Sequence, residues 1–116
     1  MPPKLDEPAT FKIFDRDIDE ITKITLSSSL ALGIDTEAMG LIHGRDRLCL
    51  IQICDELDNV ICIRIERNQN SAPNLKFILE KQEIEKVFHF ARFDVAALAS
   101  NLNIDVNPIF CTKIAS

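Results

Sequence analysis

Three apolar segments of strand length follow one another in the first part of the chain, and they restrict its fold more than any other feature. They occupy residues 30–39, 48–54 and 60–65, with turn-forming stretches at 40–46 and 55–59 between them. Connections this short join antiparallel neighbours, because a parallel crossover needs a dozen or more residues. We therefore predict an antiparallel three-stranded meander. The first strand is apolar over 30–34 and the second is almost entirely apolar over 48–54, so we expect covering helices to bury both faces of these segments.

The second part of the chain alternates helical and strand patterns. Apolar residues recur at helical spacing in 73–82 and again in 93–101, whereas 85–90 and 106–110 are short apolar strands. Strands separated by helices favour parallel pairing. The sequence therefore predicts an α/β domain whose mixed sheet combines the meander with parallel strands.

The N-terminal region is less regular. Residues 1–10 contain three of the five prolines, and we expect them to form a flexible lead-in. Residues 11–14 have the pattern of a short edge strand. After them, Ile18, Ile21 and Ile24 are spaced as one apolar face of a short helix.

Composition limits the class of protein. With 116 residues, of which 47% are hydrophobic and 27% charged, the chain is long enough for one small globular domain and too apolar to be disordered. No segment approaches the ~18 apolar residues of a membrane span. The N-terminus lacks the apolar core of a secretory signal, so the cytoplasm is the expected compartment.

The four cysteines show neither the paired spacing of a zinc site nor the density of a secreted disulfide framework. We expect them to be buried, reduced thiols of the core. They are Cys49, Cys54, Cys62 and Cys111.

Two carboxylates stand at the end of the first meander strand. Asp35 and Glu37 are two residues apart, so in a strand both side chains project from the same face. Two adjacent anions repel unless a cation lies between them, and oxygen ligands of this kind favour Mg²⁺ or Mn²⁺ over zinc. The alternative is that the strand has ended and that both are solvated surface acids.

A second acidic residue of interest, Asp94, stands near the start of the helix predicted over 93–101. Its position beside the apolar stripe predicts that it lies along the edge of the sheet and not in bulk water. Asp94 could also do no more than complement the helix dipole. The nearby His89 lies on an apolar strand, where a hydrogen-bonded core histidine is commoner than a ligand or a base.

Together these features resemble the DEDD superfamily of 3′-5′ exonucleases, and within it bacterial ribonuclease D-like proteins. A strand ending in Asp-x-Glu is followed by the meander, a helix, and then a strand and helix that carry His-x-x-x-x-Asp. The matching segments are 34–41, 45–53, 87–94 and 109–116. The resemblance implies a ribonuclease H-like fold, with a mixed five-stranded sheet and flanking helices.

The same resemblance implies a sheet order and a site. The strand through Ile34 would be central, between the strands through Leu50 and Val87, and would bring the acidic residues to one edge. Asp35, Glu37 and Asp94 would be both the catalytic residues and the ligands of two Mg²⁺ or Mn²⁺ ions that hydrolyse phosphodiesters at RNA 3′ ends. Possible substrate contacts are Met39, His89 and Phe90.

The family pattern continues beyond these motifs. A third motif, Tyr-x-x-x-Asp or its His variant, supplies the fourth carboxylate well downstream, and the sequence ends before it. We therefore expect residues 11–116 to be a partial exonuclease domain that binds metal weakly and lacks activity alone. Apolar sheet surface that the family covers would then be exposed, which favours self-association.

Two alternatives remain open. The chain could be a non-catalytic remnant of this fold that binds nucleic acid or metal. It could also be an unrelated small α/β binding domain, in which Asp35 and Glu37 are surface acids. The net charge of −5 argues only against a protein that holds nucleic acid by bulk positive charge.

Overall fold

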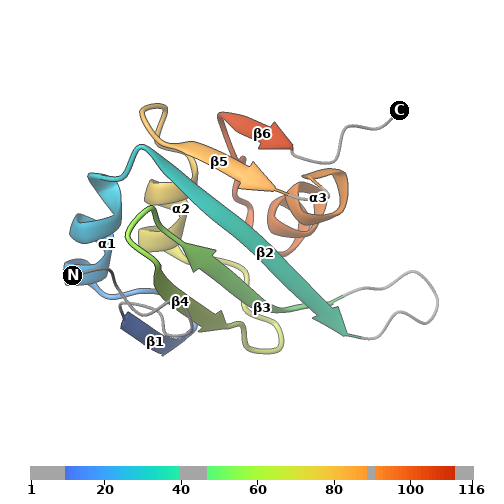
Figure 1. Ribbon diagram of the computed structural model, residues 1–116. Helices are drawn as coiled ribbons and strands as arrows, with labels where there is room; N and C mark the ends of the chain where they lie inside the picture. Colours follow the sequence, from blue (N-terminus) through green and yellow to red (C-terminus); the bar gives the residue numbers. More distant parts are fainter. Residues whose placement is uncertain (1–9, 40–46, 89–90, 112–116) are drawn as a thin grey trace.

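A six-stranded mixed sheet organises the structure, a computed structural model that describes residues 10–39, 47–88 and 91–111 (Figure 1). The strands lie in the order β1-β4-β3-β2-β5-β6. Their bounds are Thr10–Asp15 for β1, Ala31–Met39 for β2, Arg47–Cys54 for β3, Asn59–Arg64 for β4, Glu85–Phe88 for β5 and Ile109–Cys111 for β6.

The pairing confirms the predicted topology. Strands β2, β3 and β4 form the antiparallel meander, and β5 and β6 continue the sheet in parallel on the other side of β2. The central strand is therefore β2, between β3 and β5, as the sequence predicts. The sheet has six strands and not five, because β1 pairs in parallel with β4 along its whole length, from Thr10 opposite Asn59 to Asp15 opposite Arg64.

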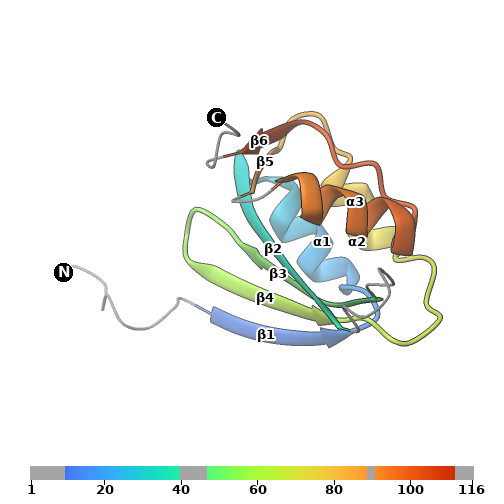
Figure 2. The same cartoon turned by 90° about the vertical axis from the view of Figure 1, so that its right-hand side faces the viewer.

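The three described helices all lie on one face of this sheet (Figure 2). They are α1 (Glu20–Ser27), α2 (Pro73–Leu79) and α3 (Ala91–Leu102). We call the opposite face, which no described helix covers, the open face. Burial of β3 on both faces was expected and is wrong, because Gln52 is exposed on the open face between the fully buried Ile51 and Ile53.

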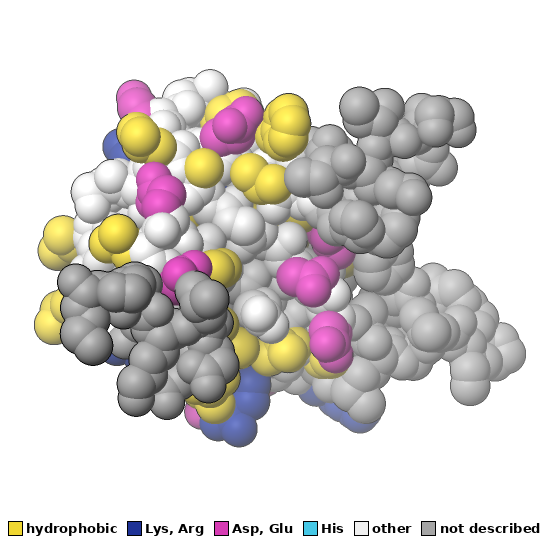
Figure 3. All heavy atoms as spheres, in the orientation of Figure 1, with side chains coloured by type: hydrophobic (Ala, Val, Ile, Leu, Met, Phe, Trp, Pro, Cys, Tyr) yellow, Lys and Arg dark blue, Asp and Glu magenta, His cyan; other side chains and the backbone are white. Residues whose placement is uncertain are grey.

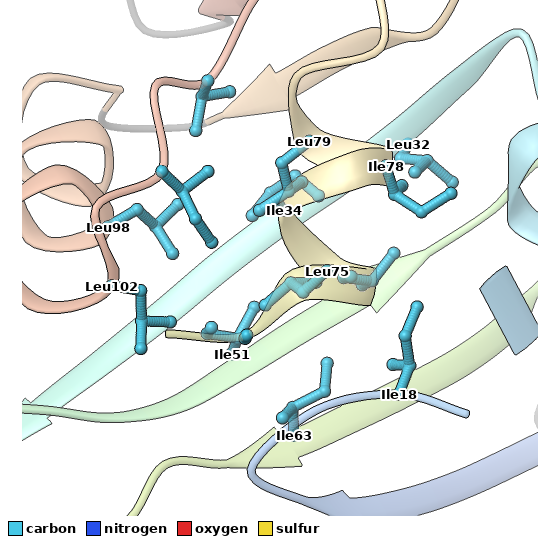
Figure 4. Close-up of a cluster of buried hydrophobic side chains, with 14 of the residues drawn as sticks. Ile18, Leu32, Ile34, Ile51, Ile63, Leu75, Ile78, Leu79, Leu98 and Leu102 are labelled. Carbon is cyan, nitrogen blue, oxygen red and sulfur yellow. The ribbon is translucent and has the colours of Figure 1, made fainter. Parts of the chain in front are cut away.

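The core lies between the sheet and the helices (Figure 4). Buried apolar side chains from the inward face of the strands and from one stripe on each of α2 and α3 form its centre. Leu75, Ile78 and Leu79 form the buried stripe of α2, which agrees with the helical spacing over 73–82, and in α3 Ala97 is buried whereas Ala99 is exposed. The residues are Leu32, Ile34, Ile51, Ile63, Leu75, Ile78, Leu79, Leu98 and Leu102.

The apolar face expected over 18–24 is not formed. Asp19 caps the helix by accepting a hydrogen bond from the Thr22 backbone N–H, so Ile18 precedes α1 and is buried outside it. Ile21 and Ile24 are 70% and 64% exposed. The buried face of α1 consists of Thr22 and Leu26, because the cap sets a later start for the helix.

Three cysteines carry free thiols, but they are half-buried and not in the core as expected. Cys54 and Cys62 project from the open face, where the register places them opposite Val60 and Gln52. Burial is the main cause that raises the pKa of both thiols. The side chain of Cys111 lies outside the described residues.

The N-terminal lead-in and the absence of a membrane span were also predicted from the sequence. Most of the predicted lead-in, residues 1–9, lies outside the described residues, and Thr10 is already the first residue of β1. Among the described residues, no helix is long and apolar enough to cross a membrane.

A buried lysine joins the two loops that flank the β5–β6 side of the sheet. Lys86 on β5 is completely buried, and its Nζ donates hydrogen bonds to the carbonyl oxygens of Lys81 and of Asn107, the latter at 2.8 Å. The first loop follows α2 and the second precedes β6. Burial lowers the pKa of Lys86 from 10.5 to about 8.

This shift predicts a pH-dependent stability. Between pH 8 and 10.5 the unfolded chain holds a proton on Lys86 that the folded chain has released, so the free energy of unfolding rises with pH in this interval. We expect urea unfolding to show that the wild type gains stability relative to Lys86→Met from pH 8 to 10.5. Below pH 8 the difference should be constant. The same pH dependence in both proteins would contradict the lowered pKa.

Candidate active site

The C-terminal half of β2 presents two carboxylates on the open face. Asp35 and Glu37 are exposed, whereas Thr36 between them is buried on the helix side. This follows from the alternation of side chains along a strand. In Figure 3, which has the orientation of Figure 1, acidic side chains gather over this half of β2. The predicted pair therefore shares one face.

The sheet is open along one edge of this segment. Among the described strands, β5 pairs with β2 only as far as Phe88 opposite Ile34, so β2 has no partner on that side from Asp35 onward. On the other side β3 continues, with a register shift between Glu37 and Ala38 that marks a β-bulge. Bulges of this kind commonly redirect side chains beside active sites.

Asp94 reaches the same segment from the helix layer. It lies in the first turn of α3 and is 4% exposed. Its Oδ1 accepts a hydrogen bond from Thr36 Oγ1 at 2.5 Å. Burial is the main cause that raises the pKa of Asp94. The negative charge of Asp35 raises it further, and the hydrogen bond from Thr36 opposes both.

The structure thus brings the three predicted carboxylates to one segment of β2, but from two sides. Asp35 and Glu37 project from the open face, and Asp94 lies on the helix side, close enough for the charge of Asp35 to act on it. In the described part of the chain, no three His, Cys, Asp or Glu side chains are grouped as they would be around a metal ion. The donors themselves, three carboxylates, are of the kind that Mg²⁺ and Mn²⁺ prefer.

The predicted substrate contacts cannot be placed. Met39 is the last residue of β2, and its side chain lies outside the described residues. His89 and Phe90, between β5 and α3, also lie outside them. These three assignments stay predictions.

Thr36 is the residue of this site that the sequence analysis missed. It is the middle residue of Asp-Thr-Glu, and strand alternation alone would have placed its side chain on the face opposite the two carboxylates. Its partner could not be found in this way, because Asp94 is 58 residues away in the sequence.

Comparison with known proteins agrees with the resemblance. A family described as 3′-5′ exonuclease matches residues 12–116. Ribonuclease D of Bartonella henselae is 32% identical over 96 residues, which cover 83% of this chain and 23% of that protein.

Two solved structures extend the comparison. Brucella melitensis NrnC with bound Mg²⁺ has a TM-score of 0.80 and 39% identity, covering 90% of this chain and 50% of that chain. Escherichia coli RNase D has a TM-score of 0.66 and 22% identity, covering 79% and 24%, which is a likeness of fold. The chain therefore spans at most about half the length of these relatives.

The proximity of Asp35 and Asp94 can be tested by titration. The charge of Asp35 raises the pKa of Asp94, so the pKa of Asp94 should fall in Asp35→Asn when it is followed by carboxyl ¹³C resonances. Asp58→Asn is a matched control. Asp58 is exposed in the turn between β3 and β4, and its positive φ of 65° suits asparagine. Equal pKa values of Asp94 in wild type and Asp35→Asn would show that the two carboxylates do not share a site.

Proposed function

We propose that this chain, which belongs to the 3′-5′ exonuclease family, carries part of the active site of a 3′-5′ exoribonuclease of the ribonuclease D and NrnC type. The observation that supports the proposal is that Asp35 and Glu37 share the open face of the central strand, and that the buried Asp94 lies close enough to Asp35 to be affected by its charge. This chain spans only part of the length of its relatives. Their activity is therefore a proposal for this chain.

The three carboxylates would hold Mg²⁺ or Mn²⁺. The Mg²⁺ bound to Brucella NrnC supports this assignment, as does the hard-oxygen character of the donors. When two such ions are bound, they activate water and stabilise the charge that develops on the phosphate. Asp35 and Glu37 would bind from the open face, and Asp94 would turn toward them from the helix side. With three carboxylates and no fourth, we expect binding to be weak.

RNA 3′ ends are the proposed substrate. Brucella NrnC has also been solved bound to pGG. A net charge of −5 offers no general attraction for a polyanion, so metal ions would supply the positive charge at the site. We assign the contacts with the terminal nucleotide to Met39, His89 and Phe90.

The cytoplasm is the proposed compartment. The free thiols of Cys49, Cys54 and Cys62 support it, because reduced cysteines are typical of proteins in that compartment.

We also propose that the chain associates with itself through the open face. Phe11 and Ile13 on β1 are 56% and 53% exposed there, and Phe110 on β6 is 51% exposed. Exposed apolar area of this kind favours association.

Sedimentation velocity over a range of protein concentrations tests the association. The wild type should form larger species as its concentration rises, and Phe11→Ser combined with Ile13→Ser should shift it toward the monomer. The control combines Ile21→Ser with Ile24→Ser, which removes two even more exposed apolar side chains from α1. A shift of the same size in the control pair would contradict a role of the open face.

The exonuclease assignment is tested with a 5′-labelled RNA that has a free 3′ hydroxyl, in Mg²⁺ or Mn²⁺. A polypeptide that continues for about 100 residues past Ser116, roughly one further domain length, should shorten the RNA from its 3′ end. Asp35→Asn should lower that rate by a factor of about 100 or more, because a ligand of the reacting centre is lost. Asp58→Asn should leave the rate unchanged.

The chain of 116 residues should show no trimming by itself, because the fourth carboxylate is absent from it. If it trims as fast as the longer polypeptide, the requirement for a further motif is wrong. If the longer polypeptide binds Mn²⁺ but trims nothing, the alternative of a non-catalytic, metal-binding member of the fold is correct.

A further inference from the structure

We infer that Thr36 is a positioning residue for Asp94, an inference that rests on the metal-dependent function proposed above. Thr36 stands between the two exposed carboxylates of β2 but faces the other way. Its hydroxyl is the group that connects the open-face pair to the buried carboxylate on α3.

The hydrogen bond from Thr36 fixes the orientation of the Asp94 carboxylate, which could otherwise rotate about its side-chain bonds. Thr36 and Asp94 are 9% and 4% exposed, so water cannot easily take the place of either partner in this hydrogen bond. A buried carboxylate that loses its donor is strongly disfavoured. Because Thr36 Oγ1 engages Oδ1, Oδ2 is the oxygen that would turn toward Asp35 and the cation.

The rigidity of Thr36 makes it suited to this role. Its backbone lies within the paired part of β2, opposite Ile51 on β3. Its branched Cβ restricts rotation about χ1. The position of the hydroxyl is therefore set by the sheet.

Two substitutions of Thr36 separate the effect of its hydroxyl from the effect of its volume. Valine has nearly the same shape as threonine but no donor, whereas serine keeps the donor and loses a methyl group. Partners that orient a ligating carboxylate typically contribute 10- to 100-fold to metal affinity. We therefore expect the hydroxyl, and not the volume, to determine how well the site binds metal.

The test measures Mn²⁺ affinity of the 116-residue chain by electron paramagnetic resonance of the free ion. Thr36→Val should raise the Kd for Mn²⁺ by about 10-fold, and Thr36→Ser should keep it within about 2-fold of the wild type. In an Asp94→Ala background, Thr36→Val should change the Kd by less than about 2-fold, because the acceptor through which Thr36 acts is gone.

The outcomes separate the inference from the function on which it rests. An equal effect of Thr36→Val in both backgrounds would overturn the inference, since a general structural effect does not depend on Asp94. No effect of Thr36→Val, with Mn²⁺ binding lost in Asp35→Asn, would overturn it while the proposed site stands. Unchanged binding in Asp35→Asn would overturn the site and the inference together. If urea unfolding shows that Thr36→Val is unfolded, Thr36→Ala replaces it in the same cycle.

Discussion

The alternation of side chains along β2 is the constraint on which the rest of the structure depends. Leu32, Ile34 and Thr36 face the helices, whereas Asp35 and Glu37 face away from them. One strand therefore contributes to the core and to the candidate site at once. A shift of one residue in its register would bury the carboxylates and expose the core side chains, so the packing of Ile34 also holds the site in place.

The burial of Asp94 is the second feature that determines the properties of the candidate site. An anion on the helix side of β2 is costly, and the raised pKa of Asp94 reflects that cost together with the charge of Asp35. A buried carboxylate whose pKa is raised by burial and by a neighbouring charge is typical of functional sites. A cation would relieve the repulsion between Asp35 and Asp94, which connects the electrostatics of the free protein to its proposed ligand.

Local patterns in the sequence were sufficient for much of this account. The antiparallel meander, the buried stripe of α2 and the shared face of Asp35 and Glu37 follow from short connections and periodicity. The central place of β2 in the sheet was implied by the resemblance to a known family. Features that are set by contacts between residues distant in the sequence could not be predicted from local patterns. The pairing of β1 with β4 and the hydrogen bond from Thr36 to Asp94 depend on the tertiary fold. The start of α1, and with it the face that is buried, is set by the cap at Asp19 and not by the spacing of the isoleucines.

The central claim is that the cation binds where β2 meets the start of α3. The most direct test is to add substoichiometric Mn²⁺ and to record which backbone amide resonances are broadened. The account predicts selective broadening at 35–37 and around Asp94. The acidic turn at 55–59 lies near the N-terminal end of β2, because Cys54 pairs with Gly33, and its signals should be broadened less than those of 35–37 and Asp94. Broadening centred on that turn, or equal broadening along the whole chain, would contradict the claim.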